Sequence, residues 1–194
     1  MMSSLKTLTL VALAFSIFLF GCDNDPEPVN DQETITVVTI SFQETDATGN
    51  AVGTPLEYSW TDEDGDGGND PVVDSIFLKP LATYDASLIV LNTAVTPEEN
   101  ITSEIVTEGA DHQFFYVKDG APNITFTYAD EDANLKPIGV ETKVETGAAS
   151  HGALKITLIH LPEKSATGVS SGDITHAGGE TDFESTPAFP LVIK

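Results

Sequence analysis

Apolar and polar residues alternate along most of the chain after Glu33. In these stretches every second side chain is apolar, which is typical of a β-strand with one buried face. The stretches are residues 35–42, 56–60, 84–90, 124–128, 138–145 and 154–158. In the first of them the pattern changes face after Val37, since Val38, Ile40 and Phe42 form the second apolar row. That change predicts a β-bulge between Val37 and Val38.

Strands with one apolar and one polar face are typical of antiparallel sheets that are covered on one side. Turn-forming pairs such as Asp-Gly and Lys-Pro separate the stretches. We therefore predict an all-β protein, an antiparallel β-sandwich of immunoglobulin-like type over residues 33–194. The last stretch, residues 181–193, contains Pro187 and Pro190, which predicts a place at a sheet edge.

One segment has a helical pattern instead. Thr96 is a suitable N-cap residue, Pro97 suits the first helical position, and Glu99 completes a capping box. Ile101 and Ile105 lie one turn apart, so they share a face. We predict a short helix over residues 97–108, and a long loop over the Gly- and Ser-rich residues 162–179.

The N-terminus has the three parts of a secretory signal: Lys6, an apolar run from Leu8 to Phe20, and the small Gly21 before the cleavage point. The run is too short to span a bilayer, which needs about 20 residues. Leu-x-Gly-Cys at residues 19–22 resembles a bacterial lipobox. We predict a signal peptide over residues 1–21, lipidation of Cys22, and an acidic tether over residues 22–32. The protein is then anchored in the cell envelope at the outer membrane, and the acidic residues after Cys22 favour surface exposure.

The composition narrows the choice of partners. The net charge is −23, and all 8 basic residues are lysines. Nucleic-acid binding needs a basic surface and is excluded, whereas a strongly negative field attracts cations. Cys22 is the only cysteine, so a disulfide framework and a thiolate metal site are also excluded.

Carboxylates at alternate positions follow the strand that ends at Trp60. Ca²⁺ prefers six to eight oxygen ligands, and glycines allow a loop to curl around the ion. The pattern matches only half of an EF-hand loop, so the alternative is an acidic hairpin turn. The predicted ligand-loop residues are Asp62, Asp64, Asp66, Gly68 and Asp70. A weaker copy after Tyr128, without the glycines, adds Asp130, Asp132 and Asn134.

Three histidines suggest a transition metal as an alternative, because neutral imidazole suits Zn²⁺ and Cu²⁺. These are His112, His160 and His176, and no pair has a typical ligand spacing. His160 is predicted to point to the same face as Leu158. The alternative to a metal ligand is therefore a half-buried histidine at the end of a strand. If successive strands alternate in direction, both acidic loops and the three histidines emerge at the same end of the sandwich, together with Glu180 and Asp182.

Four stretches resemble small Bacteroidetes lipoproteins of no established activity: Gly21-Cys22 with its tether, residues 62–69, residues 111–115 and residues 178–182. Some of these relatives carry a type 1 periplasmic-binding-fold label, which denotes a two-lobed α/β protein, longer and less β-rich than this chain. The resemblance implies a lipoprotein location. Together, these features predict a non-enzymatic envelope lipoprotein, stabilised by calcium, that presents a loop-rich end to a protein or glycan ligand. The alternatives are a metal-capturing lipoprotein and a glycan hydrolase with a carboxylate pair.

Overall fold

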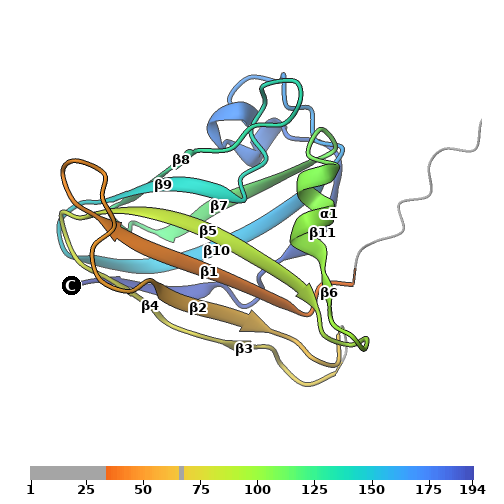
Figure 1. The fold of residues 1–194 in the computed structure, drawn as a ribbon, viewed down its shortest axis with the longest axis horizontal. Coiled ribbons are helices and arrows are strands. Elements are labelled where there is room, and N and C mark those ends of the chain that lie inside the picture. Colours follow the sequence, from red (N-terminus) through yellow and green to blue (C-terminus); the bar gives the residue numbers. More distant parts are fainter. Residues whose placement is uncertain (1–33, 66–67) are drawn as a thin grey trace, which may run out of the picture. The chain divides into compact units, whose positions relative to one another are not determined.

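The computed structural model describes residues 34–65 and 68–194, which fold as two β-sheets packed face to face (Figure 1). The predicted all-β sandwich is therefore confirmed. Cys22, the signal peptide, the tether and Asp66 lie outside the described residues. Among the described residues, no helix has the length and apolar character needed to cross a membrane.

The first sheet has the order β3-β2-β1-β5-β9-β8, with β6 beside β5. Its strands are β1 (Val37–Thr45), β2 (Leu56–Thr61), β3 (Val72–Val73), β5 (Thr83–Asn92), β6 (Glu99–Asn100), β8 (Ile124–Tyr128) and β9 (Glu141–Thr146). The second sheet has β10 (Ser150–His160) at its centre, with β7 (His112–Gly120) on one side. On the other side lie β11 (Glu180–Glu184) and β12 (Phe189–Ile193), and β4 (Ile76–Leu78) pairs with β12 in parallel.

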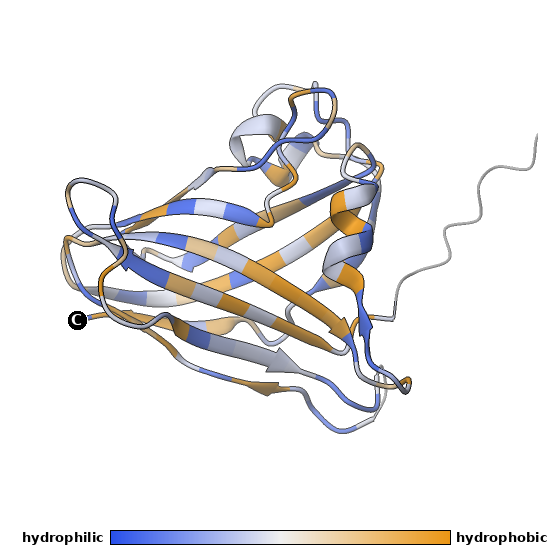
Figure 2. Cartoon of the chain, in the orientation of Figure 1, coloured by the Kyte–Doolittle hydropathy of each residue, from blue (hydrophilic) through white to orange (hydrophobic). Residues whose placement is uncertain are grey.

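The core lies between the two sheets, and the predicted alternation supplies it. Val38, Ile40 and Phe42 of β1 are fully buried. Leu154, Ile156 and Leu158 face them from the second sheet, also fully buried. Figure 2 shows the resulting alternation of apolar and polar positions along the strands.

One prediction about the strands is wrong, and another holds only in part. β1 pairs without interruption to β2 and β5, so there is no bulge at Val37 and Val38. A bulge there would disrupt two ladders at once, and Ile35 precedes the strand instead of belonging to it. The stretch 181–193 forms two strands instead of one: β11 lies at an edge of the second sheet, as predicted, but β12, which contains Pro190, lies between β10 and β4. The fold tolerates Pro190 because β4 pairs with β12 only from Leu191 onward.

The predicted helix exists but is shorter. Helix α1 (Ile101–Thr107) begins after Asn100, whose side chain accepts a hydrogen bond from the Ser103 N–H. Residues Glu99 and Asn100 pair with β5 as β6, and an extended segment cannot also form the first helical turn. Ile101 and Ile105 are buried in the core, as their spacing predicted.

The predicted loop at residues 162–179 contains two short 3₁₀ turns, η1 (Val169–Ser171) and η2 (Ile174–His176). It folds onto the outer face of the second sheet, where Val169 and Ala177 pack with Phe115 and Ile159 in a small second core. The loop therefore covers the strands β7 and β10 close to the end at which their histidines lie.

Candidate metal site

His112 and His160 lie side by side on the inner face of the second sheet. They are direct partners in the pairing of β7 with β10. In a strand, residues two apart point to the same face of the sheet. His112 therefore points to the face of Phe114, and His160 to the face of Leu158, and both of these neighbours are buried in the core. Their rings stack in parallel, with centroids 4.9 Å apart and planes 12° apart.

A β-bulge brings Asp182 to these rings. Leu158 pairs with Phe183 and Ile159 with Thr181, so Asp182 is the extra residue on β11. A regular strand would turn Asp182 to the face opposite Phe183, whereas a bulge redirects side chains and occurs often beside functional sites. Phe183 points into the core against Trp60, and Asp182 reaches His112 from the same strand.

The distances suit one small cation. One ligand atom from each of His112, His160 and Asp182 can be chosen so that all three lie within 4.8 Å of one another. His112 Nε2 and Asp182 Oδ2 are 3.6 Å apart. Two ligands of a tetrahedral Zn²⁺ are about 3.4 Å apart, given bonds of about 2.0–2.2 Å. Small side-chain rotations therefore bring the group to coordination distance.

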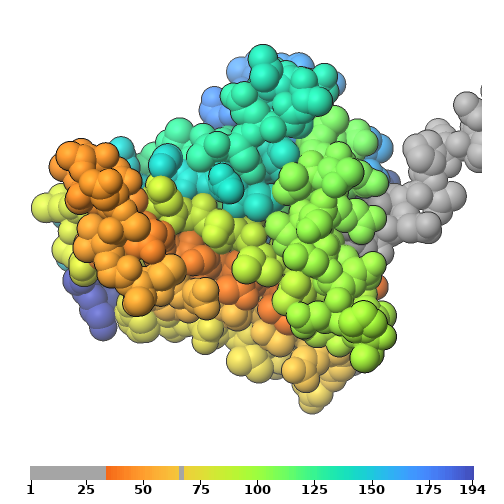
Figure 3. All heavy atoms as spheres, in the orientation of Figure 1, coloured from red at the N-terminus to blue at the C-terminus, as the bar shows by residue number. Residues whose placement is uncertain are grey.

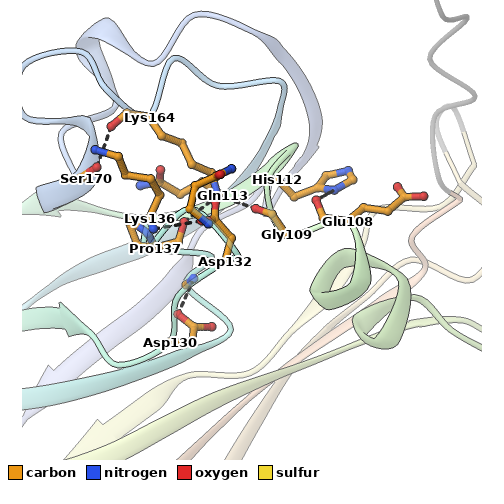
Figure 4. Close-up of polar contacts among 12 residues, drawn as sticks. Glu108, Gly109, His112, Gln113, Asp130, Asp132, Lys136, Pro137, Lys164 and Ser170 are labelled. Atoms are coloured by element: carbon orange, nitrogen blue, oxygen red, sulfur yellow. Dashed lines mark hydrogen bonds and ion pairs between the residues drawn. The ribbon is translucent and has the colours of Figure 1, made fainter.

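The opposite nitrogen of His112 is positioned by helix α1. Nδ1 lies 3.3 Å from the carbonyl oxygen of Glu108, just after the helix (Figure 4). A carbonyl only accepts, so Nδ1 carries the proton, and in the neutral ring the lone pair is on Nε2, toward Asp182. Metal-binding histidines usually donate their second N–H to such a carbonyl or carboxylate. The ring is therefore held in the tautomer that binds a metal.

The carboxylate and one imidazole are removed from water. The side chain of Asp182 is 2% exposed and that of His112 is 3% exposed. An ionised carboxylate in such a place needs a positive partner, which either a protonated imidazole or a metal cation provides. A cleft of about 600 Å³ lies between the acidic loop and β11; Trp60, Asp62, Asp70, Thr181, Asp182 and Glu184 are among its lining residues, and His112 and His160 are not.

The structure thus brings together two of the three histidines considered from sequence. His176 lies in η2 and does not belong to this group. Asp182 takes the third position among the described residues. Strand parity predicted that it lies at the same end as the histidines, and the pairing register shows how it reaches them. Its signal in the sequence is weak, because the bulge that redirects it carries no glycine or proline.

The predicted calcium loop after β2 is organised by its own hydrogen bonds. Asp62 accepts from the Gly65 N–H, and Asp64 accepts from the backbone and side-chain amides of Asn69. The Asn69 backbone bond in particular lowers the pKa of Asp64. A Cβ atom at Gly68 would lie 2.4 Å from the Asp64 carboxylate carbon, so a larger residue there would displace that carboxylate. Asp66 lies outside the described residues, and calcium binding here stays a prediction.

The carboxylates of the second acidic loop also accept hydrogen bonds from the chain itself, and calcium binding at Asp130, Asp132 and Asn134 stays a prediction. Asp130 accepts hydrogen bonds from the N–H groups of Gly139, Val140 and Glu141. Asp132 accepts from the N–H groups of Asn134 and Lys136 through Oδ1. All four carboxylate oxygens of Asp130 and Asp132 are therefore engaged by donors once Lys164 is included.

Lys164 completes this network from the 162–179 segment. Its ammonium group donates to Asp132 Oδ2 at 3.0 Å and to the carbonyls of Gly109 and Pro137 (Figure 4). The Lys164 side chain is 6% exposed, and burial lowers its pKa while the bond to Asp132 opposes that shift. A single lysine in a loop gives no signal in the sequence that it is buried.

No protein-family model, curated protein or solved structure matches this chain. The function of this chain therefore has to be inferred from the residues of the site and their geometry.

Proposed function

We propose that this protein is a non-enzymatic, lipid-anchored envelope protein whose β-sandwich binds a transition-metal ion through His112, His160 and Asp182. The observation that carries the proposal is the convergence of two imidazoles and a buried carboxylate from three neighbouring strands within 4.8 Å. The bulge at Asp182 and the Glu108 carbonyl behind His112 support it, because both orient ligand atoms toward one point.

The chemistry of the donor set favours Zn²⁺ or Cu²⁺ over Ca²⁺. Imidazole nitrogen is a good ligand for Zn²⁺, Cu²⁺ and Ni²⁺, whereas Ca²⁺ selects oxygen ligands in a larger shell. The net charge of −23 attracts any cation to the protein, so the ligand atoms have to supply the selectivity.

Titration calorimetry with Zn²⁺, Cu²⁺ and Ca²⁺ tests the proposal. We expect one Zn²⁺ or Cu²⁺ ion per chain, and a large loss of affinity in Asp182→Asn. His176→Ala is the matched control, since it removes a histidine outside the group. Equal affinity in wild-type protein and Asp182→Asn would refute the proposal, as would a weakening by His176→Ala of the same size.

The location is tested separately. We expect Cys22→Ala to prevent fatty-acid incorporation and to release the protein from membrane fractions, because the lipidated cysteine is the expected anchor. A variant that still fractionates with membranes, together with wild-type protein that takes up no labelled fatty acid, would contradict the lipoprotein assignment.

Calcium stabilisation remains a second candidate, for the loop at residues 62–70. The specific observation is that Asp62 and Asp70 line the same cleft as Asp182. A cation that enters this cleft meets the loop carboxylates on one side and Asp182 on the other. Calcium that binds with unchanged affinity in Asp182→Asn would place its site in the loop.

A further inference from the structure

The two sheets do not close against each other along one side of the sandwich. β8 is the last strand of the first sheet, and β7 pairs only with β10. These two strands follow each other in the chain and diverge after residues 121–123. We call the opening between them the seam, lined by Tyr116, Lys118, Thr125, Phe126 and Tyr128.

Three adjoining hollows form a continuous groove along the seam. The central one has a volume of about 230 Å³. It shares Lys118 and Thr125 with a hollow of about 490 Å³ toward Asn123. It shares Phe126, Tyr128 and Ser171 with a hollow of about 390 Å³ toward Pro137. Figure 3 shows the loop that follows β8, in teal, beside the blue 162–179 segment at this end.

The backbone of β8 presents hydrogen-bonding groups to this groove. Asn123 accepts from Gly147 N–H and Ala129 donates to Glu141, so the odd-numbered residues of β8 face β9. In a β-strand the alternate residues point the other way, so the N–H and C=O groups of Phe126 and Tyr128 point outward. Within residues 34–65 and 68–194, no strand pairs with this edge.

Two side-chain hydrogen bonds bridge the seam, and two aromatic rings fill the space between them. At its closed ends, Lys118 Nζ donates to the Ile124 carbonyl and Tyr128 Oη donates to the Phe114 carbonyl. Between them, the rings of Tyr116 and Phe126 stack at 4.5 Å and form an apolar floor. Both rings are half-buried, so this floor is accessible from the groove.

We infer that the seam binds an extended, basic polypeptide segment that adds a strand to β8. Strand addition gives affinity through main-chain hydrogen bonds and specificity through alternate side chains. Here alternate apolar side chains would contact the floor of Tyr116 and Phe126. The charge argues for a basic segment, because Asp130, Glu131 and Glu145 line the hollows and the net charge is −23. Lys118 is the one basic residue among the described residues of their lining, and its ammonium group is bonded to the Ile124 carbonyl. This binding surface is separate from the metal site.

The test uses a capped, fluorescein-labelled heptapeptide of alternating lysine and valine, and a control peptide with proline in place of the central valine. Both have the same charge, but proline removes a backbone donor and disfavours the strand. Fluorescence anisotropy should show about tenfold tighter binding of the valine peptide, as expected for one lost backbone hydrogen bond together with the disfavoured strand conformation. Equal binding of the two peptides, or binding of neither, would overturn the inference.

Amide hydrogen exchange locates the binding. The N–H groups of Phe126 and Tyr128 should become protected when the valine peptide binds, while those of Thr125 and Thr127 should change little because they already face β9. Glu131→Lys should weaken binding, and Glu98→Lys, an exposed acid outside the seam, should not. Protection elsewhere, or perturbation of Tyr116 and Phe126 by cellohexaose alone, would overturn the inference and, in the second case, assign the seam to a glycan.

Discussion

Asp132 and Asp182 are two carboxylates with the same burial and different surroundings. Each side chain is 2% exposed, and each faces a basic residue from a distant part of the chain. Asp132 is surrounded by N–H donors: two backbone amides and the ammonium group of Lys164. Asp182 is surrounded by the ring nitrogens of His112 and His160.

This difference separates a structural network from a ligand set. An ammonium group has three donors and no lone pair, so Lys164 can only stabilise the folded chain. An imidazole nitrogen can donate a proton or bind a cation, so the group around Asp182 has a second chemical use. Burial alone therefore does not identify a functional carboxylate, and the atoms that face it do.

The largest expected effect is on the structural network. Lys164→Met leaves Asp132 and the carbonyls of Gly109 and Pro137 without their shared donor, and should lower the free energy of unfolding by about 3–5 kcal/mol. The control is Lys143→Met, which breaks an ion pair with Asp85 at the surface and should cost less than about 1 kcal/mol. Urea denaturation measures both, and equal losses would mean that Lys164 has no structural role beyond a surface pair.

The next effect separates the two carboxylates by their response to zinc. At a free concentration of about 100 times Kd, Zn²⁺ should stabilise the wild-type protein by about 2.7 kcal/mol. Asp182→Asn should lose most of this gain, and Asp132→Asn should keep it despite a lower starting stability. Thermal melts in EDTA and in buffered zinc measure the difference. A zinc gain that disappears in Asp132→Asn but not in Asp182→Asn would reverse the assignment.

A smaller effect concerns pH. Burial raises the pKa of Asp132, but the hydrogen bonds from Lys136, Lys164 and Asn134 outweigh it, so its pKa is lowered in the folded state. The ionised form therefore stabilises the fold above the unfolded pKa of about 3.9, and this contribution is lost as the pH falls through the folded pKa. The stability difference between wild type and Asp132→Asn should shrink below about pH 4. A constant difference between pH 7 and pH 3 would contradict this account.

The smallest effect is expected at the acidic loop of residues 62–70. If the loop holds calcium, Ca²⁺ should raise the melting temperature more than Mg²⁺ at fixed ionic strength, and Asp64→Asn should remove the excess. If the loop is only an acidic turn, both cations act through screening and shift the melting temperature equally. Asp74→Asn is the control, since its carboxylate bonds the Ser59 N–H outside this loop.

The sequence predicted the sandwich because alternation is a local property. The apolar rows of β1 and β10 need only a period of two to be recognised, and both are buried as expected. His112 and His160 were predicted as candidates by residue type alone. Asp182 depends on the bulge in the β10–β11 pairing, and Lys164 on the fold of a loop over the second sheet. Both features arise from contacts between distant segments, which no local pattern records.

The central claim is that one transition-metal ion binds between two imidazoles and a carboxylate. Zinc K-edge X-ray absorption of the protein loaded with one equivalent of Zn²⁺ tests it most directly, because imidazole rings give a characteristic multiple-scattering pattern. The account predicts two histidine ligands with Zn–N distances of about 2.0–2.1 Å and oxygen in the remaining positions. The pattern should fall to one histidine in His160→Ala and stay unchanged in His176→Ala. An all-oxygen shell, or a histidine contribution lost in His176→Ala, would contradict the claim.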